Sequence, residues 1–275
     1  MEPFNIHKEE YFVIADWMQN EHNLMAGFTS KNGGKSKGDF TSLNVGFHVE
    51  DNKESVLENR EHLAKNLSFP LDHWVGAQQT HETNIVKVTK QDRGRGAREY
   101  ENAFKQTDGF FTFESGIFLT LCYADCVPLY FFHPGSGAIG IAHAGWKGTV
   151  HGIAEKMIQC FQSEGLKASE IHVAIGPSIC EKCYIVDERV IKLVQNKLED
   201  VDIKPYNLIS DQQYTLDLKE CNKEILLKSG VQNKHILKTN LCTSCQKEYF
   251  YSHRRDHGKT GRMMSFIGWK EDLQS

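Results

Sequence analysis

The sequence predicts a mixed α and β fold (α+β), and three observations carry this prediction. Two apolar runs rich in aromatic and β-branched residues, 117–132 and 138–142, flank the turn sequence HPGSG. Pro128 lies inside the first run and would disrupt a helix, which favours strands. In contrast, residues 54–67 carry Val56, Leu63 and Leu67 at helical spacing. The fold should therefore combine buried sheets with surface helices.

Strands and helices alternate along the rest of the chain. We expect a first strand at 12–17 and a polar loop at 28–39. The elements expected after them are a helix at 54–67, a strand at 84–88, the two apolar strands, a helix at 149–163 ended by Gly165, a strand at 171–175, helices at 188–197 and 218–228, and a strand at 235–239.

The composition is that of a globular protein with a sizeable core. Of 275 residues, 40% are hydrophobic and 25% are charged, which excludes collagen-like and disordered classes. A formal net charge of −4 gives no electrostatic reason to expect nucleic acid or an anionic membrane as a partner. No repeat or low-complexity linker divides the sequence, so we expect a single catalytic domain over residues 1–275.

The chain carries the features of a cytoplasmic protein. Its N-terminal residues resemble neither a secretory signal nor a transit peptide. No apolar run approaches the ~18 residues that a membrane span needs. Eight cysteines are too few for a disulfide scaffold, so we expect thiols or metal ligands in the cytosol.

The turn between the two apolar runs brings a thiol close to an imidazole. A parallel crossover needs about a dozen residues, so the runs should form an antiparallel hairpin. Pairing Phe132 with Ala138 places residue 127 opposite residue 143. Cys126 and His143 then lie on neighbouring rungs, about 5–8 Å apart.

His81, at the end of the polar stretch QQTH, is a third candidate ligand. Two imidazoles and one thiolate suit zinc and leave a fourth position for water or substrate. Copper is possible with the same ligands. Asp125 cannot face the same side of a strand as Cys126, because neighbouring side chains alternate. We therefore expect Asp125 to support the ligands, and we name Asp125 and Cys126 as catalytic candidates.

The same residues allow other interpretations. A cysteine on an apolar strand is most often a small buried hydrophobic residue. In a cysteine hydrolase, Cys126 would be the nucleophile and His143 the base, and His81 would not be required. In a binding module, zinc would be structural and held by a closed set of four ligands.

Two further motifs have the spacing of metal ligands. Cys180 with Cys183, and Cys242 with Cys245, are both Cys-X-X-Cys and together could form a Cys₄ zinc site. The two pairs are farther apart in the sequence than in a zinc ribbon. We therefore expect free thiols near the rim of the site, with no metal and no obligatory disulfide.

Eight segments carry a family resemblance. In chain order they are GFT 27–29 with GG 33–34, SLNVG 42–46, NR 59–60, QTH 79–81, ADCVP 124–128, AHAGWKG 142–148, IGPSI 175–179, and RR 254–255 with GR 261–262. Together they resemble the YlmD/YfiH family, often labelled "polyphenol oxidase (laccase) domain". The resemblance extends over about residues 27–267, nearly the whole chain.

The resemblance implies a fold, a metal and an activity. The implied fold is a layered α/β/β/α sandwich with mixed sheets, related to cytotoxic necrotizing factor-like cysteine hydrolases. The implied zinc is held by His81, Cys126 and His143. The implied enzyme is a purine nucleoside phosphorylase that converts adenosine, inosine, guanosine or methylthioadenosine and phosphate to the base and a ribose 1-phosphate, with adenosine deaminase activity.

The histidines disfavour the laccase label. Multicopper oxidases need several copper centres, typically with His-X-His pairs, and no two of the 13 histidines are two residues apart. One Cys and two His could hold a single copper ion. A single copper centre of this kind transfers one electron at a time and cannot by itself carry out the four-electron reduction of dioxygen. A copper-dependent polyphenol oxidase remains an alternative on the family label.

Purine chemistry requires groups beyond the metal ligands. The His-X-Glu and Pro-Cys-X-X-Cys signature of the zinc deaminases is absent. Phosphorolysis needs an anion-binding site, because phosphate attacks the nucleoside, and a guanidinium can bind phosphate oxygens in a bidentate way. The candidate substrate-binding residues are the cations Arg60, Lys147, Arg254 and Arg255, with Asn44 and Gln79 as hydrogen-bonding partners of base or ribose.

Overall fold

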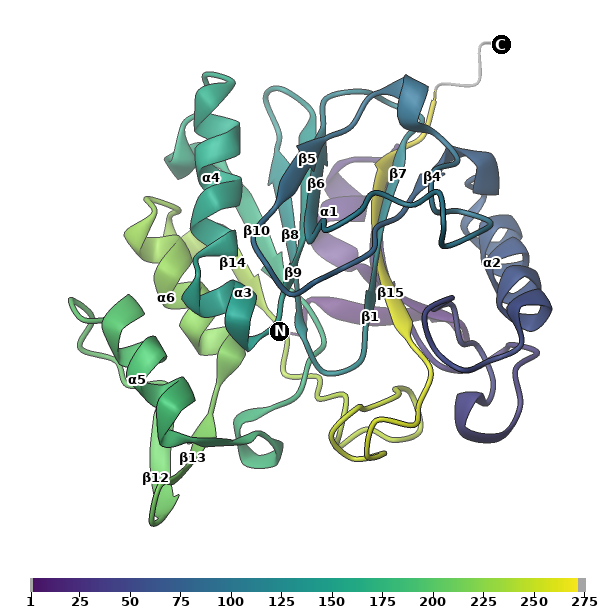
Figure 1. The fold of residues 1–275 in the computed structure, drawn as a ribbon. Helices are drawn as coiled ribbons and strands as arrows, with labels where there is room; N and C mark the ends of the chain where they lie inside the picture. Colours follow the sequence, from purple (N-terminus) through teal and green to yellow (C-terminus); the bar gives the residue numbers. More distant parts are fainter. Residues whose placement is uncertain (1, 272–275) are drawn as a thin grey trace.

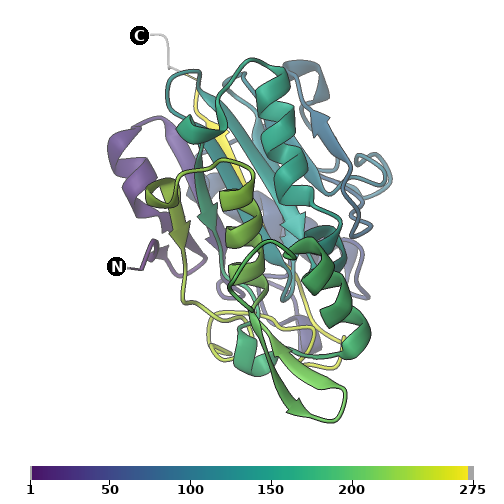
Figure 2. The same ribbon diagram turned by 90° about the vertical axis from the view of Figure 1, so that its left-hand side faces the viewer.

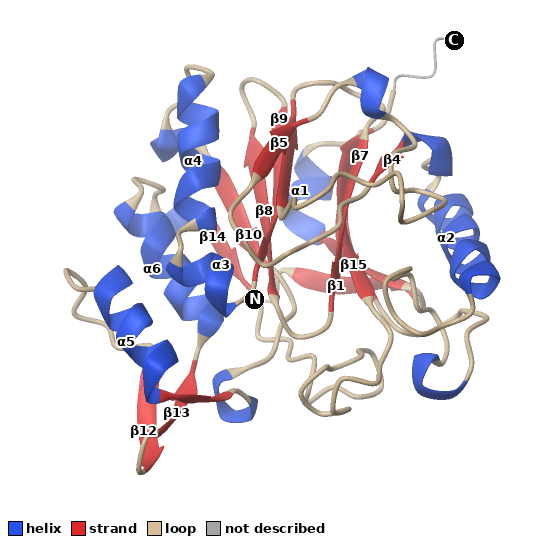
Figure 3. Ribbon diagram, viewed as in Figure 1, coloured by secondary structure: helices blue, strands red, loops and turns tan. Residues whose placement is uncertain are grey.

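Two six-stranded sheets pack face to face in this computed structural model, which describes residues 2–271 (Figures 1 and 3). In order across the first sheet are β1 (Phe4–Lys8), β2 (Tyr11–Ile14), β3 (Leu24–Thr29), β15 (Met263–Trp269), β7 (Phe118–Tyr123) and β4 (Trp74–Val75). In order across the second are β14 (Ile236–Lys238), β10 (His172–Ile175), β8 (Val127–His133), β9 (Ala138–Ala144), β6 (Gly109–Thr112) and β5 (Ile85–Lys87). Both sheets are mixed, and each parallel pair includes an edge strand.

Helices cover the outer faces of both sheets, which gives four layers in the order α/β/β/α (Figures 1 and 2). The first sheet is covered by α2 (Lys53–Leu67), and α1 (Ala15–Asn20) follows β2. The second sheet is covered by α3 (Trp146–Val150), α4 (Ile153–Ser163), α5 (Glu188–Lys197) and α6 (Leu218–Lys228). A small antiparallel sheet of β11 (Ile185–Asp187), β13 (Gln213–Leu216) and β12 (Tyr206–Ser210) extends beyond α5.

Neighbouring side chains of β8 point to opposite faces of the second sheet, so this strand contributes to the apolar cores on both sides. Tyr130 points into the apolar core between the two sheets, whereas its neighbour Phe131 packs into the core under α4 and α6. Both side chains are fully buried, and burial of one such side chain contributes roughly 1.5–3 kcal/mol. A third core, which includes Leu63 and Trp74, lies between α2 and the first sheet.

Several predicted elements are confirmed. The helices predicted at 188–197 and 218–228 have those bounds, and the helix predicted at 54–67 begins one residue earlier. β8 and β9 form the predicted antiparallel hairpin, with the register shifted by one residue, so that Pro128 pairs with His143. No helix in residues 2–271 combines the length and apolarity that crossing a bilayer demands.

Three predicted elements are wrong in their extent. The run 117–132 is two strands, because the chain leaves the first sheet after Tyr123 and enters the second at Val127. The helix predicted at 149–163 is interrupted at Gly152, whose φ of 80° lies in the left-handed region that glycine favours. The strand predicted at 12–17 ends at Ile14, and α1 then carries Trp17 into the core between the sheets.

Candidate active site and metal centre

Cys126 lies where the chain crosses from one sheet to the other. The preceding residue, Asp125, has a φ of 85°, a conformation that Asp tolerates better than most residues. Its Oδ1 accepts a hydrogen bond from the Thr243 hydroxyl at 2.6 Å. Its Oδ2 accepts hydrogen bonds from the Ser252 hydroxyl at 3.0 Å and the Arg254 amide at 2.7 Å. The carboxylate beside the cysteine therefore anchors the C-terminal segment to the crossing.

The predicted trio of His81, Cys126 and His143 is brought together. Their ligand atoms all lie within 4.8 Å of one another. His143 is buried near the end of β9, Cys126 is half-buried, and His81 is exposed. The donors are two imidazole nitrogens and one thiol sulfur, a set that fits zinc or another thiophilic ion.

Gly145 leaves the space that these side chains occupy. A Cβ atom at this position would lie 3.0 Å from Sγ of Cys126 and 3.0 Å from Cδ2 of His81. The φ of Gly145 is −66°, so the backbone itself would accept any residue. The constraint is therefore steric, and it comes from the candidate ligands.

Asp108 holds both histidines and was not predicted. Its Oδ1 lies 2.8 Å from Nδ1 of His143 and accepts the backbone N–H of His81 at 3.1 Å. Its Oδ2 accepts the backbone N–H groups of Thr80 and Glu82. Burial alone would raise the pKa of Asp108, but the hydrogen bond and charge of His143, with the N–H groups of Glu82 and Thr80, lower it. A carboxylate only accepts, so Nδ1 of His143 bears the proton and Nε2 remains for Cys126 or a metal.

The trio favours a charged thiolate next to a charged imidazole. Burial alone would raise the pKa of the Cys126 thiol, but the charge of His143 and hydrogen bonds from His143 and His81 lower it to about 6. Burial alone would lower the pKa of His143, but Cys126 and Asp108 raise it to about 9. A thiolate at neutral pH is what a metal ligand or a cysteine nucleophile requires.

A cavity of about 270 Å³ opens beside the trio. The residues that line it with the trio are His48, Gln79, Tyr100, Cys122, Ala124, His253 and Arg262. Gln79 is fixed there, because its side-chain amide accepts from the Cys122 N–H at 2.7 Å and donates to the Cys122 carbonyl at 2.9 Å. Gln79 was predicted, and Ala124 and Arg262 belong to segments that carry the family resemblance. His48, Tyr100, Cys122 and His253 were not predicted, because they come from separate segments.

The other five predicted substrate-binding residues are not among those that line the cavity. Buried Arg60 donates to the carbonyls of Val45, Gly96 and Ala97. Its guanidinium therefore links two segments of the protein.

Arg255 and Asn44 have similar contacts within the protein. Arg255 donates to the carbonyls of Thr243 and Phe250. The Asn44 side-chain oxygen accepts the backbone N–H of Arg262 at 2.8 Å. These contacts fix the segments that surround the cavity.

Lys147 and Arg254 are exposed outside the cavity. The ammonium of Lys147 lies 5.7 Å from the ring centre of Trp146, and the guanidinium of Arg254 lies 4.9 Å from that of Tyr184. A substrate contact by Asn44, Arg60, Lys147, Arg254 or Arg255 stays a prediction.

Comparison with known proteins places the chain in a family. Residues 25–270 match the family described as "Multi-copper polyphenol oxidoreductase laccase", and the chain belongs to that family. It is 49% identical to "Purine nucleoside phosphorylase YlmD" of Bacillus subtilis over 273 residues, which cover 98% of each chain. The resemblance to the YlmD/YfiH family is thereby confirmed.

Solved structures agree over the whole fold. The crystal structure of YlmD from Geobacillus stearothermophilus superposes with a TM-score of 0.96 at 46% identity, and covers 98% of this chain and 100% of that one. The crystal structure of the hypothetical protein YfiH from Bacillus licheniformis gives a TM-score of 0.92 at 45% identity, with the same coverage. The mixed α/β fold is therefore shared with these proteins.

Proposed function

We propose that the protein is a purine nucleoside phosphorylase that uses zinc held by His81, Cys126 and His143. The observation that carries the proposal is this trio of donors beside a cavity of nucleoside size, in a chain 49% identical to a protein named for that activity. The proposed substrates are adenosine, inosine, guanosine and methylthioadenosine with phosphate. Adenosine deamination is proposed as a second activity of the same site.

The donor set supports a catalytic metal over a structural one. In the part of the chain that the structure describes, no fourth His, Cys, Asp or Glu side chain joins the trio. Three protein ligands are typical of catalytic zinc, which would supply Lewis acidity when bound. Copper would suit the same donors, so metal analysis has to identify the ion.

Arg262 is the cavity residue best suited to phosphate. Arg262 lines the cavity, and its backbone N–H is held by the side chain of buried Asn44. Its Nη1 donates to the carbonyls of Thr260 and Gly261, which orients the guanidinium. A guanidinium binds phosphate oxygens through two parallel hydrogen bonds. The rings of His48 and Tyr100, which also line the cavity, lie 5.8 Å apart and offer ring faces to a purine.

The pair formed by Cys126 and His143 also supports a second candidate function, a cysteine hydrolase. The lowered pKa of Cys126 and the raised pKa of His143, oriented by Asp108, are typical of an activated nucleophile. This alternative corresponds to the proposed relationship with cytotoxic necrotizing factor-like hydrolases. It does not use His81 as a ligand.

Phosphate dependence distinguishes these functions. Purified protein is incubated with inosine with and without inorganic phosphate, and hypoxanthine and ribose 1-phosphate are measured. We expect both products only with phosphate, full activity in Cys160→Ser, and none in Cys126→Ser. Hypoxanthine release at the same rate without phosphate would mean hydrolysis of the nucleoside. Hydrolysis of amides that stops when Cys126 is alkylated would establish the cysteine hydrolase.

A further inference from the structure

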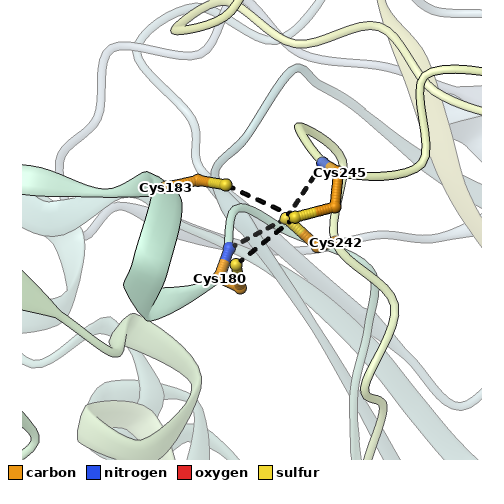
Figure 4. Close-up of side chains that lie close together, drawn as sticks. All are labelled: Cys180, Cys183, Cys242 and Cys245. Atoms are coloured by element: carbon orange, nitrogen blue, oxygen red, sulfur yellow. Dashed lines mark hydrogen bonds between the residues drawn. The ribbon is translucent and has the colours of Figure 1, made fainter.

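The four cysteines of the two Cys-X-X-Cys motifs form a second cluster (Figure 4). Cys180 and Cys183 border a short 3₁₀ turn, and Cys242 and Cys245 lie on a turn near the C-terminal end of the chain. An isolated parallel bridge pairs Ser178 with Cys242 and brings the two turns side by side. The fold therefore brings together two motifs that are far apart in the sequence, in contrast to the independent thiols that their separation predicts.

The sulfur positions match a tetrahedral metal site. All four Sγ atoms lie within 4.8 Å of one another. Sγ of Cys245 is 3.4 Å from that of Cys183 and 3.8 Å from that of Cys180. Four sulfurs at about 2.3 Å from a tetrahedral zinc ion lie about 3.8 Å from one another. All eight cysteines of the chain are free, so the cluster is not two disulfides.

Backbone N–H groups contact the buried sulfur of Cys242, and a lysine side chain is hydrogen-bonded beside it. Sγ of buried Cys242 accepts backbone N–H groups from Cys180 at 3.2 Å and from Cys245 at 3.4 Å. The side-chain ammonium of buried Lys219 donates to the carbonyl of Leu241, next to Cys242. N–H groups and a nearby cation stabilise negative charge on sulfur.

We propose that Cys180, Cys183, Cys242 and Cys245 bind a structural zinc ion as a tetrathiolate. Four thiols that bind one Zn²⁺ release four protons and leave a site of net charge −2, which the positive charge of Lys219 partly offsets. Four protein ligands leave no position for substrate, so this zinc cross-links two segments and takes no part in the reaction.

The cross-link supports the wall of the active site. Thr243 lies inside the second Cys-X-X-Cys motif, and its hydroxyl donates a hydrogen bond to Asp125. The Asp125 carboxylate also accepts hydrogen bonds from the Ser252 hydroxyl and the Arg254 amide. His253 lies between these two residues and lines the cavity. Zinc at the cluster would therefore fix the turn that carries Thr243. Through Asp125, this turn supports the part of the cavity wall that includes His253.

Metal counting in matched variants tests the proposal. Protein purified without added metal is analysed by mass spectrometry for zinc, copper and iron. If both sites bind zinc, we expect two ions per chain in the wild type and in the control Cys160→Ser. Cys245→Ser, which changes an exposed residue, should lose one ion and keep the other, and Cys126→Ser should lose only the ion of the trio.

These counts separate the two metal proposals. One zinc ion that Cys245→Ser removes and Cys126→Ser retains would support the cluster and contradict zinc at the trio. Zinc that is unchanged in Cys245→Ser, iron in place of zinc, or disulfides between these cysteines in the purified protein would overturn the tetrathiolate zinc.

Cobalt substitution gives a second measurement that does not depend on the stability of a variant. Cobalt(II) replaces zinc in the wild-type protein, and the thiolate-to-cobalt absorption is recorded. Its intensity rises with the number of thiolate ligands, so the cluster should dominate the spectrum over the single thiolate of Cys126. A spectrum with the intensity of one thiolate only would contradict the proposal.

Discussion

The hydroxyl of Thr243 donates to Oδ1 of Asp125 at 2.6 Å, and this bond joins the turn that carries Cys242 and Cys245 to the sheet crossing that carries Cys126. Both residues are buried. The hydrogen bond between Thr243 and Asp125 therefore links the trio to the four-cysteine cluster, although the two sites share no candidate ligand. An aspartate next to a cysteine in an apolar run is explained by this connection.

Asp125→Asn should destabilise the protein more than it affects metal binding at the site proposed for the trio. Both carboxylate oxygens of Asp125 now accept hydrogen bonds, and in the variant one of them would be replaced by an NH₂ group that faces another donor. A buried group left without a partner costs roughly 1–3 kcal/mol. We expect that loss in the free energy of urea unfolding, with metal retained better than in Cys126→Ser. The exposed change Asp39→Asn is the control. Loss of the trio's metal at unchanged stability would show that Asp125 acts on the ligands directly.

Asp108→Asn should weaken metal binding at the trio. The change removes the carboxylate that accepts the Nδ1 proton of His143 and holds the backbone of His81. Loss of such a partner typically lowers metal affinity or activity about 10–100-fold. Competition with a chromophoric chelator measures the affinity, and Asp39→Asn again serves as the control. An unchanged affinity would contradict the role assigned to Asp108.

Gly145→Ala should crowd the candidate ligands without straining the backbone. The new methyl group would lie 3.0 Å from Cys126 Sγ and His81 Cδ2, closer than ordinary contact. We expect a clear loss of metal and activity at nearly constant thermal stability. Gly135→Ala, in the exposed turn between β8 and β9, should change neither. A fully active Gly145→Ala protein would mean that the trio moves more freely than its packing indicates.

The hairpin pattern predicted that Cys126 and His143 lie close together, whereas His81 joined them as a candidate before a strand and through the family resemblance. The short turn after His133 allows only an antiparallel hairpin, so Cys126 and His143 had to be near each other. The observed register differs by one residue from the predicted one because His133 still belongs to β8 and pairs with Ala138, which shortens the turn to residues 134–137. Asp108 was missed because an aspartate before a strand is equally typical of an ordinary turn.

Features that depend on distant contacts could not be predicted in the same way. β15 lies in the middle of the first sheet, between β3 and β7, and its pairing involves residues far apart in the sequence. The cysteine cluster likewise depends on contacts between distant segments, namely the bridge between Ser178 and Cys242 and the hydrogen bond from the Cys180 N–H to Sγ of Cys242. The small sheet of β11, β12 and β13 was missed because its strands are largely exposed and lack an apolar alternation.

Arg262→Gln should raise the phosphate KM of the proposed phosphorylase more than Lys147→Ala does. Arg262 lines the cavity, whereas Lys147 is exposed outside it. A hydrogen bond to a charged group contributes about 1.5–3 kcal/mol, so removal of the guanidinium should raise the KM for phosphate roughly 10-fold or more. The KM for inosine should change less, because the ring faces of His48 and Tyr100 remain. Initial rates at varied phosphate, with zinc content and thermal unfolding as controls for folding, give the comparison. If Lys147→Ala has the larger effect, phosphate binds on the exposed side of α3. The sequence-based prediction that Lys147 binds phosphate would then be correct, and the assignment of phosphate to Arg262 would be wrong.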